Sequence, residues 1–187
     1  MSVGSILGLD CATKTGWCLL GADGKPIESG VQDFSKRRGE SNGLVFLRFR
    51  KWLTELIQAL PDKPGLVPYE RAHFRGGAAT ELCVGLQTRV QEVCAELGIE
   101  SAPVPTMTLK KSATGSGKAG KDTMIETARA ILGREPIDDN EADAVHVASW
   151  AFKEYGSECG SASGLKNRAT EGRSEERRVG KECRSRW

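Results

Sequence analysis

The stretch SILGLDCATKTGWCLL, residues 5–20, decides the fold. It opens with a short, nearly continuous apolar run that ends in Asp10, a pattern typical of a buried strand. The turn-like segment CATK separates this run from a second one, TGWCLL, so the two are predicted to form a hairpin. Another turn signal, ADGK, precedes the strand-like segment IESGVQDF at residues 27–34. Three antiparallel strands are therefore expected at the start of the chain.

Helical and extended patterns alternate along the rest of the chain. They predict, in order, a helix over 44–60, a strand over 65–70, a helix over 82–97, a strand over 99–105, and helices over about 122–132 and from about 140. The glycine-bearing segment KKSATGSGKAGK, residues 110–121, is expected to be a polar loop. This order predicts an α/β fold in which helices flank both faces of a mixed five-stranded sheet.

Composition limits the class of protein. With 187 residues and 39% hydrophobic content, the chain can bury one sizeable core. No apolar segment approaches eighteen residues, and the N-terminus lacks the pattern of a signal peptide, so we expect a cytoplasmic protein without a membrane anchor. The six cysteines form no C-x-x-C pair, which indicates reduced thiols and argues against a structural zinc site.

The C-terminal end differs in character from the body of the chain. Residues 157–172 are rich in Gly and Ser and are expected to form a flexible tail. Residues 173–187, RSEERRVGKECRSRW, resemble the translation of a sequencing adapter, so we interpret them as a disordered, non-native scar. Because this segment carries six basic and three acidic residues, it accounts for the net charge of +2. A basic nucleic-acid-binding tail is the alternative.

Four acids crowd the start of the last predicted helix: Asp138, Asp139, Glu141 and Asp143 lie within six positions. A helix N-terminus favours one or two acids in its first turn. Four indicate that a cation is bound nearby.

Two further acids are placed to share this cation. Asp10 ends the first predicted strand and Glu70 the fourth, and sites in open α/β sheets gather at the carboxyl ends of neighbouring strands. Asp139 and Asp143 are four residues apart, so they lie on one face of their helix. Clustered carboxylates are ligands that suit Mg²⁺ or Mn²⁺.

These motifs together resemble the RuvC-type Holliday junction resolvases of the RNase H-like superfamily, particularly the phage branch, over about residues 5–156. Three stretches look like the family's segments that carry the catalytic acids. They are ILGLDCATKTGWCLL with Asp10, VPYERAHFRGGAATELCVGLQTRV with Glu70, and NEADAVHVASWA with Asp143. LKKSATGSGKAGKD resembles its lysine- and glycine-bearing stretch and matches Lys110 and Lys121. The resemblance implies an RNase H-like fold and assigns residues 1–156 to a nuclease domain.

The fourth metal ligand is open. The cellular enzymes place it three residues before the last Asp, and that position here is Asn140. An Asn carbonyl oxygen, Asp139 and Glu141 are the alternatives. We favour Asp139, whose other interpretation is a helix N-cap that touches no metal.

Basic residues are candidates for contacts with a phosphate backbone. Lys110 is expected to hold the scissile phosphate or to stabilise transition-state charge. The other candidates for DNA contacts are Arg71, His73, Arg75, Lys111, Lys118 and Lys121. An ordinary surface role is the alternative for each and is preferred for His73, while His146 is expected to be structural. GSGK is not a Walker A motif, because Lys118 is followed by Ala.

The resemblance implies a metal-dependent endonuclease that nicks branched DNA, most simply four-way junctions, with two Mg²⁺ ions per active site and Mn²⁺ as a substitute. It further implies a homodimer in a bacterial or phage-infected cell. An actin-like or sugar-kinase-type ATPase and a catalytically silent DNA-binding relative are the alternatives. The sequence leaves open the preference among junctions, flaps and forks, the base step that is cut, and the host.

Overall fold

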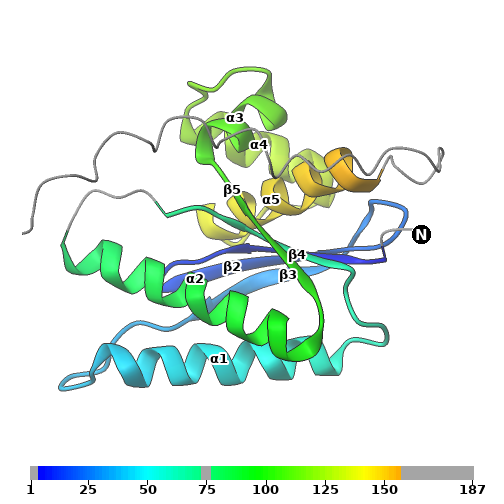
Figure 1. Cartoon of the computed structure of the whole chain (residues 1–187). Coiled ribbons are helices and arrows are strands. Elements are labelled where there is room, and N and C mark those ends of the chain that lie inside the picture. Colours follow the sequence, from blue (N-terminus) through cyan, green and yellow to red (C-terminus); the bar gives the residue numbers. More distant parts are fainter. Residues whose placement is uncertain (1–3, 73–76, 157–187) are drawn as a thin grey trace, which may run out of the picture.

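A five-stranded mixed sheet forms the centre of the computed structural model, which describes residues 4–72 and 77–156 (Figure 1). Its strands are β1 (Ile6–Asp10), β2 (Lys14–Leu20), β3 (Pro26–Asp33), β4 (Leu66–Glu70) and β5 (Glu100–Val104). They lie in the order β3-β2-β1-β4-β5, with antiparallel pairs in the β1–β2–β3 meander and parallel pairs from β1 to β4 and from β4 to β5. The predicted mixed sheet of five strands is confirmed.

Helices cover both faces of this sheet (Figure 1). One layer holds α1 (Asn42–Ala59) and α2 (Ala78–Leu97), and the other holds α3 (Thr106–Thr114), α4 (Lys121–Leu132) and α5 (Asp139–Tyr155). Alternate side chains of each strand point to opposite faces, so Leu7 and Leu9 of β1 join the core under α1 and α2, whereas Ile6 joins the core under α5. The α/β architecture expected from the sequence is therefore confirmed.

The helix α3 corrects one prediction, because residues 110–121 were expected to form a loop throughout. Lys110 and Lys111 lie on α3, and the connection begins only at Gly115, which caps the helix with a φ of 77°. A nine-residue helix with one buried side chain, Leu109, shows too little apolar periodicity to stand out in the sequence. The two lysines are consequently held on a fixed element.

Two glycines allow α5 to lie directly against the sheet. A Cβ at Gly8 of β1 would stand 2.6 Å from the backbone nitrogen of Ala148, and a Cβ at Gly16 of β2 would overlap the carbonyl oxygen of Asn140. Real side chains do not tolerate such approaches. The small residues therefore fix how close α5 comes to β1 and β2.

Further predictions concern the cysteines, membrane-spanning helices and the C-terminal end of the chain. Four cysteines, at positions 11, 18, 83 and 94, are free thiols. In residues 4–72 and 77–156, no helix has the length and apolar character needed to cross a membrane. The interpretations of residues 157–172 and 173–187 lie outside the described residues.

Candidate active site

Asp10 and Glu70 lie side by side at one edge of the sheet. Leu9 of β1 pairs with Tyr69 of β4 in parallel register, so the next residue on each strand is one of the two acids. Both strands end there, and both acids are only partly exposed. The register therefore brings the two carboxylates together at the carboxyl ends of neighbouring strands, as predicted.

The helix α5 brings more negative charge to the same edge. Burial first, and then the charges of Glu70, Asp143 and Asp139, raise the pKa of Asp10 well above its usual value. Burial, Glu70 and Asp139 likewise raise the pKa of Asp143 to about 7, although Lys110 and Lys121 oppose the shift. Carboxylates that destabilise one another in this way bind a cation favourably, since it removes their repulsion.

This donor set fits a hard divalent ion in its chemistry, because it consists of carboxylate oxygens. The acids are gathered but not closed around a point: within residues 4–72 and 77–156, no three His, Cys, Asp or Glu side chains are already assembled to hold an ion. Binding would therefore have to draw the carboxylates together.

Asp139 faces this cluster and is not the cap of α5. The capping residue is Asp138, whose Oδ1 accepts hydrogen bonds from the backbone N–H groups of Asn140 at 2.9 Å and Glu141 at 3.1 Å. Asp139 instead pairs with Lys121, with 2.9 Å between Oδ2 and Nζ, and this bond lowers the pKa of Asp139. The alternative interpretation of Asp139 as an N-cap is wrong.

Glu141 is removed from the list of possible metal ligands. Its side chain is 0% exposed and points away from the acids, toward β3, where it binds Arg134 and Ser29. Burial opposes its ionisation, but hydrogen bonds from Arg134, the Ile137 backbone and Ser29 leave its pKa below the ordinary value. Glu141 therefore stabilises the packing of α5 on β3 through these contacts and does not belong to the cluster of acids.

Asn140 takes part in the helix start. Its side-chain Nδ2 donates to Oδ2 of the capping Asp138 at 3.0 Å, and its backbone lies over Gly16. Asp139 stays the favoured fourth ligand, as a prediction.

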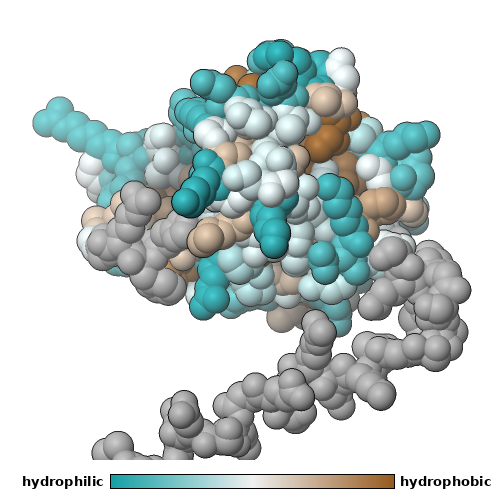
Figure 2. Space-filling view, turned by 90° about the horizontal axis from the view of Figure 1, so that it is seen from above, coloured by the Kyte–Doolittle hydropathy of each residue, from teal (hydrophilic) through white to brown (hydrophobic). Residues whose placement is uncertain are grey.

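Two of the predicted phosphate-binding lysines reach the acids. Lys110 and Lys121 both lower the pKa of Asp143 by their positive charge. Lys111 on α3 and Lys118 on the α3–α4 connection are exposed on the adjoining surface. Seen from above, the molecule has a mixed surface, on which hydrophilic side chains lie among residues of intermediate hydropathy and one hydrophobic patch (Figure 2).

Between β4 and α2, residues 71, 72 and 77 are described and residues 73–76 are not. Arg71 is exposed, and its backbone N–H donates to the Val104 oxygen at 2.8 Å, which prolongs the pairing of β4 with β5. The predicted DNA contacts at His73 and Arg75 lie outside the described residues.

Sequence reasoning missed two residues at the site. Thr106, at the start of α3, donates its hydroxyl hydrogen to Oε1 of Glu70. The signal was available, because Val104 pairs with Glu70 and brings the end of β5 to the same edge. Lys14, at the start of β2, adds positive charge beside Asp139. In the sequence it stands out only as part of the turn-like segment CATK.

His146 is structural, as expected. It is buried in α5, and its Nε2 lies 2.8 Å from the backbone oxygen of Met124 in α4, to which it donates. Burial lowers its pKa, so the ring stays neutral and ties the two helices together.

Comparison with solved structures identifies the fold. The structure of Thermus thermophilus RuvC matches 81% of the chain and 96% of its own length, with a TM-score of 0.69 at 20% sequence identity. A second match is T. thermophilus RuvC in complex with Holliday junction substrate, with a TM-score of 0.70, 20% identity and coverage of 81% and 95%. The fold is that of RuvC. The RNase H-like architecture predicted from the motifs is thereby confirmed.

Sequence comparison points the same way. The crossover junction endodeoxyribonuclease RuvC of Synechococcus sp. (strain WH7803) is 28% identical over 149 residues, which are 76% of this chain and 94% of that relative. RuvC of Rubrobacter xylanophilus is 29% identical over 150 residues, 76% of this chain and 82% of that relative. RuvC of Anaeromyxobacter sp. (strain K) is 50% identical over 40 residues, 21% of this chain and 22% of that relative. No family model matches the chain.

Proposed function

We propose that this chain is a metal-dependent crossover junction endodeoxyribonuclease that nicks four-way DNA junctions. One observation carries the proposal: β1, β4 and α5 bring Asp10, Glu70, Asp139 and Asp143 close enough to raise the pKa of two of them, beside Lys110 and Lys121. The similarity to RuvC endonucleases over most of their length supports this assignment. So does the likeness to a RuvC fold that has been solved with a Holliday junction substrate.

Asp10, Glu70, Asp139 and Asp143 would hold two Mg²⁺ ions, for which Mn²⁺ substitutes. Bound there, the ions would activate water and polarise the phosphodiester. Asp10 would contribute to holding both ions, because the charges of all three other acids act on it.

The surrounding residues prepare this site. Thr106 fixes one carboxylate oxygen of Glu70, and the side chain of Gln87 holds the Glu70 backbone oxygen at 2.8 Å. Lys110, beside Asp143, is placed to hold the scissile phosphate and to stabilise charge that develops on it. Lys121 neutralises Asp139 and would be available to bind a phosphate if Asp139 held a metal ion.

The wider DNA surface would comprise Lys111 and Lys118, with Arg71 directly after β4. His73 and Arg75 lie outside the described residues and stay candidates from the sequence alone, with an ordinary surface role preferred for His73. We infer a homodimer, because one chain offers one acidic site whereas resolving a junction requires two paired nicks. The nuclease is assigned to residues 1–156, and the setting to the cytoplasm of a bacterial or phage-infected cell.

A cleavage assay in Mg²⁺ tests this function by comparing labelled four-way, flap and linear DNA. The salt concentration is matched, because salt strongly shifts phosphate-driven binding. Symmetric paired nicks in the four-way junction, and their loss in Asp10→Asn, are expected. Preferential cutting of flaps would show that flaps, and not four-way junctions, are the substrate. Junction binding without any cutting would show that the chain is a catalytically silent DNA-binding protein.

A further inference from the structure

An ion pair between the half-exposed Arg134 and the fully buried Glu141 ties the start of α5 to the edge strand β3. Arg134 follows α4, and its Nη2 lies 2.6 Å from Oε1 of Glu141 while its Nη1 lies 3.2 Å from Oε2. Ser29 of β3 completes the group: its hydroxyl donates to Glu141 Oε1 at 2.7 Å and accepts from Arg134 Nη2 at 2.9 Å. We call Arg134, Glu141 and Ser29 the α5 bracket.

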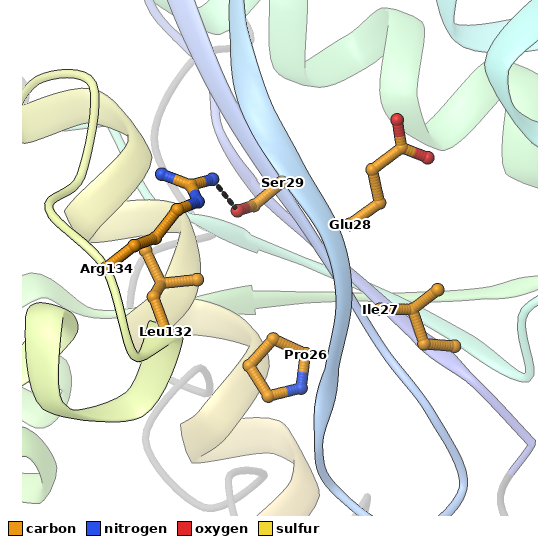
Figure 3. Close-up of a pocket in the computed structure, with 6 residues that line it drawn as sticks. All are labelled: Pro26, Ile27, Glu28, Ser29, Leu132 and Arg134. Carbon is orange, nitrogen blue, oxygen red and sulfur yellow. Dashed lines mark hydrogen bonds between the residues drawn. The ribbon is translucent and has the colours of Figure 1, made fainter.

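The α5 bracket also fixes the α4–α5 connection. The backbone N–H of Ile137 donates to Glu141 Oε2 at 2.5 Å, and Arg134 Nη1 donates to the backbone oxygen of Glu135 at 2.9 Å. Figure 3 shows Arg134 and Leu132 reaching across to Pro26 and Ser29, whereas Glu28 points away from them. Each carboxylate oxygen of Glu141 thus accepts two hydrogen bonds, which satisfies a fully buried charge.

The position of Glu141 within α5 links the α5 bracket to the orientation of Asp139 and Asp143. Glu141 lies two residues after Asp139 and two before Asp143, about 200° around the helix from each of them. The two acids that share one face therefore meet the site when the opposite face is held on β3. The contact of Asn140 with Gly16 lies between these two faces and leaves the helix start no room to shift toward the sheet.

We propose that Arg134, Glu141 and Ser29 are positioning residues, which hold Asp139 and Asp143 in place for metal binding without touching the metal or the DNA. This inference rests on the proposed function and deepens it. If the α5 bracket is weakened, the first turn of α5 becomes free to move, and the acids lose their common alignment. Metal affinity then falls, while DNA binding through lysines elsewhere is preserved.

The test compares Arg134→Gln with Arg129→Gln in the full chain. Arg129 is a matched control, because its guanidinium also pairs with a glutamate of the α4–α5 connection, at 2.9 Å between Nη2 and Glu135 Oε1, but both side chains are exposed. Mn²⁺ affinity is measured by calorimetry below the unfolding transition of each variant. We expect the Mn²⁺ Kd to rise by about tenfold or more in Arg134→Gln and to stay unchanged in Arg129→Gln.

Two further variants grade the effect. Arg134→Lys keeps the charge but not the paired contact with Glu141, so it is expected to fall between Arg134→Gln and the wild type. Ser29→Ala removes one hydroxyl without leaving a buried charge unpaired, so it should fold and show a smaller rise in Kd. Junction binding in EDTA is expected to match the wild type in all four variants.

Amide hydrogen exchange separates a failure of this inference from a failure of the proposed function. Faster exchange in the first turn of α5, in Arg134→Gln and Ser29→Ala but not in Arg129→Gln, is expected whether or not metal is added. Unchanged exchange there, or unchanged Mn²⁺ affinity with only a lower melting temperature, would overturn the positioning role. A wild-type protein that neither binds Mn²⁺ nor cuts junctions would instead refute the proposed nuclease, and the exchange data would still decide whether the α5 bracket holds the helix.

Discussion

The backbone carbonyl of Asn140 lies directly over Gly16, in space that any side chain at residue 16 would occupy. Gly16 is the hairpin partner of Asp10, so this contact sets the start of α5 beside the first acid of the site. The missing side chain at one strand position thus determines how near Asp143 comes to Asp10.

Replacing Gly16 with Ala should therefore displace the start of α5 and disturb the acidic site. The added methyl group must push the α5 backbone outward, which typically costs about 1–3 kcal/mol of stability in a packed core. Junction cleavage should fall more than melting temperature suggests, because Asp139 and Asp143 move with the helix. Gly43→Ala is the control, since a Cβ there would meet only Ser41 Oγ at 3.7 Å. A Gly16→Ala protein with wild-type cleavage would show that α5 is not held at this contact.

The bond from Thr106 to Glu70 predicts a second effect. Thr106→Val keeps the shape of the side chain but removes the donor, so Glu70 loses the group that orients it. Losses of this kind typically cost about 10–100-fold in metal affinity. Thr106→Ser retains the hydroxyl and should retain most of the affinity in a Mn²⁺ titration. Equal affinities for the Val and Ser variants would remove Thr106 from the site.

The raised pKa of Asp143, about 7, predicts a pH-dependent penalty on folding without metal. Between its unfolded pKa near 4 and about 7, the folded protein holds the proton more tightly than the unfolded chain, so this group's contribution to stability falls as pH rises. Asp143→Asn carries no such penalty.

Thermal unfolding in EDTA checks this sign. The melting temperature of Asp143→Asn should be close to that of the wild type near pH 4, should exceed it increasingly up to about pH 7, and should keep a constant lead above that pH. Mg²⁺ should raise the wild-type melting temperature at high pH and thereby narrow the gap. A gap that is constant with pH would mean that burial and the neighbouring acids do not raise the pKa of Asp143.

Much of this fold could be predicted because its strands are short apolar runs that end in acids or turns. Asp10 and Glu70 could be paired from sequence for the same reason, since both end parallel strands. The helix α3 could not, because only Leu109 is buried in it. Glu141 was misjudged as a possible ligand because a sequence shows that acids cluster, not which way each one points. Its partner Ser29 is 112 positions away along the chain, beyond any local pattern.

Cleavage by Asp143→Asn in Mg²⁺ tests the central claim most directly. The change preserves size and hydrogen bonding but removes one charge from the acids that are proposed to hold the metal. Cleavage of a labelled four-way junction should fall by at least about a hundredfold. Junction binding measured in EDTA should persist or tighten, because a repulsive carboxylate is gone while the lysines remain. Asn140→Ala, made in parallel, should cost little if Asp139 is the fourth ligand. Near wild-type cleavage by Asp143→Asn would contradict the account and leave Asp143 without a role in metal binding.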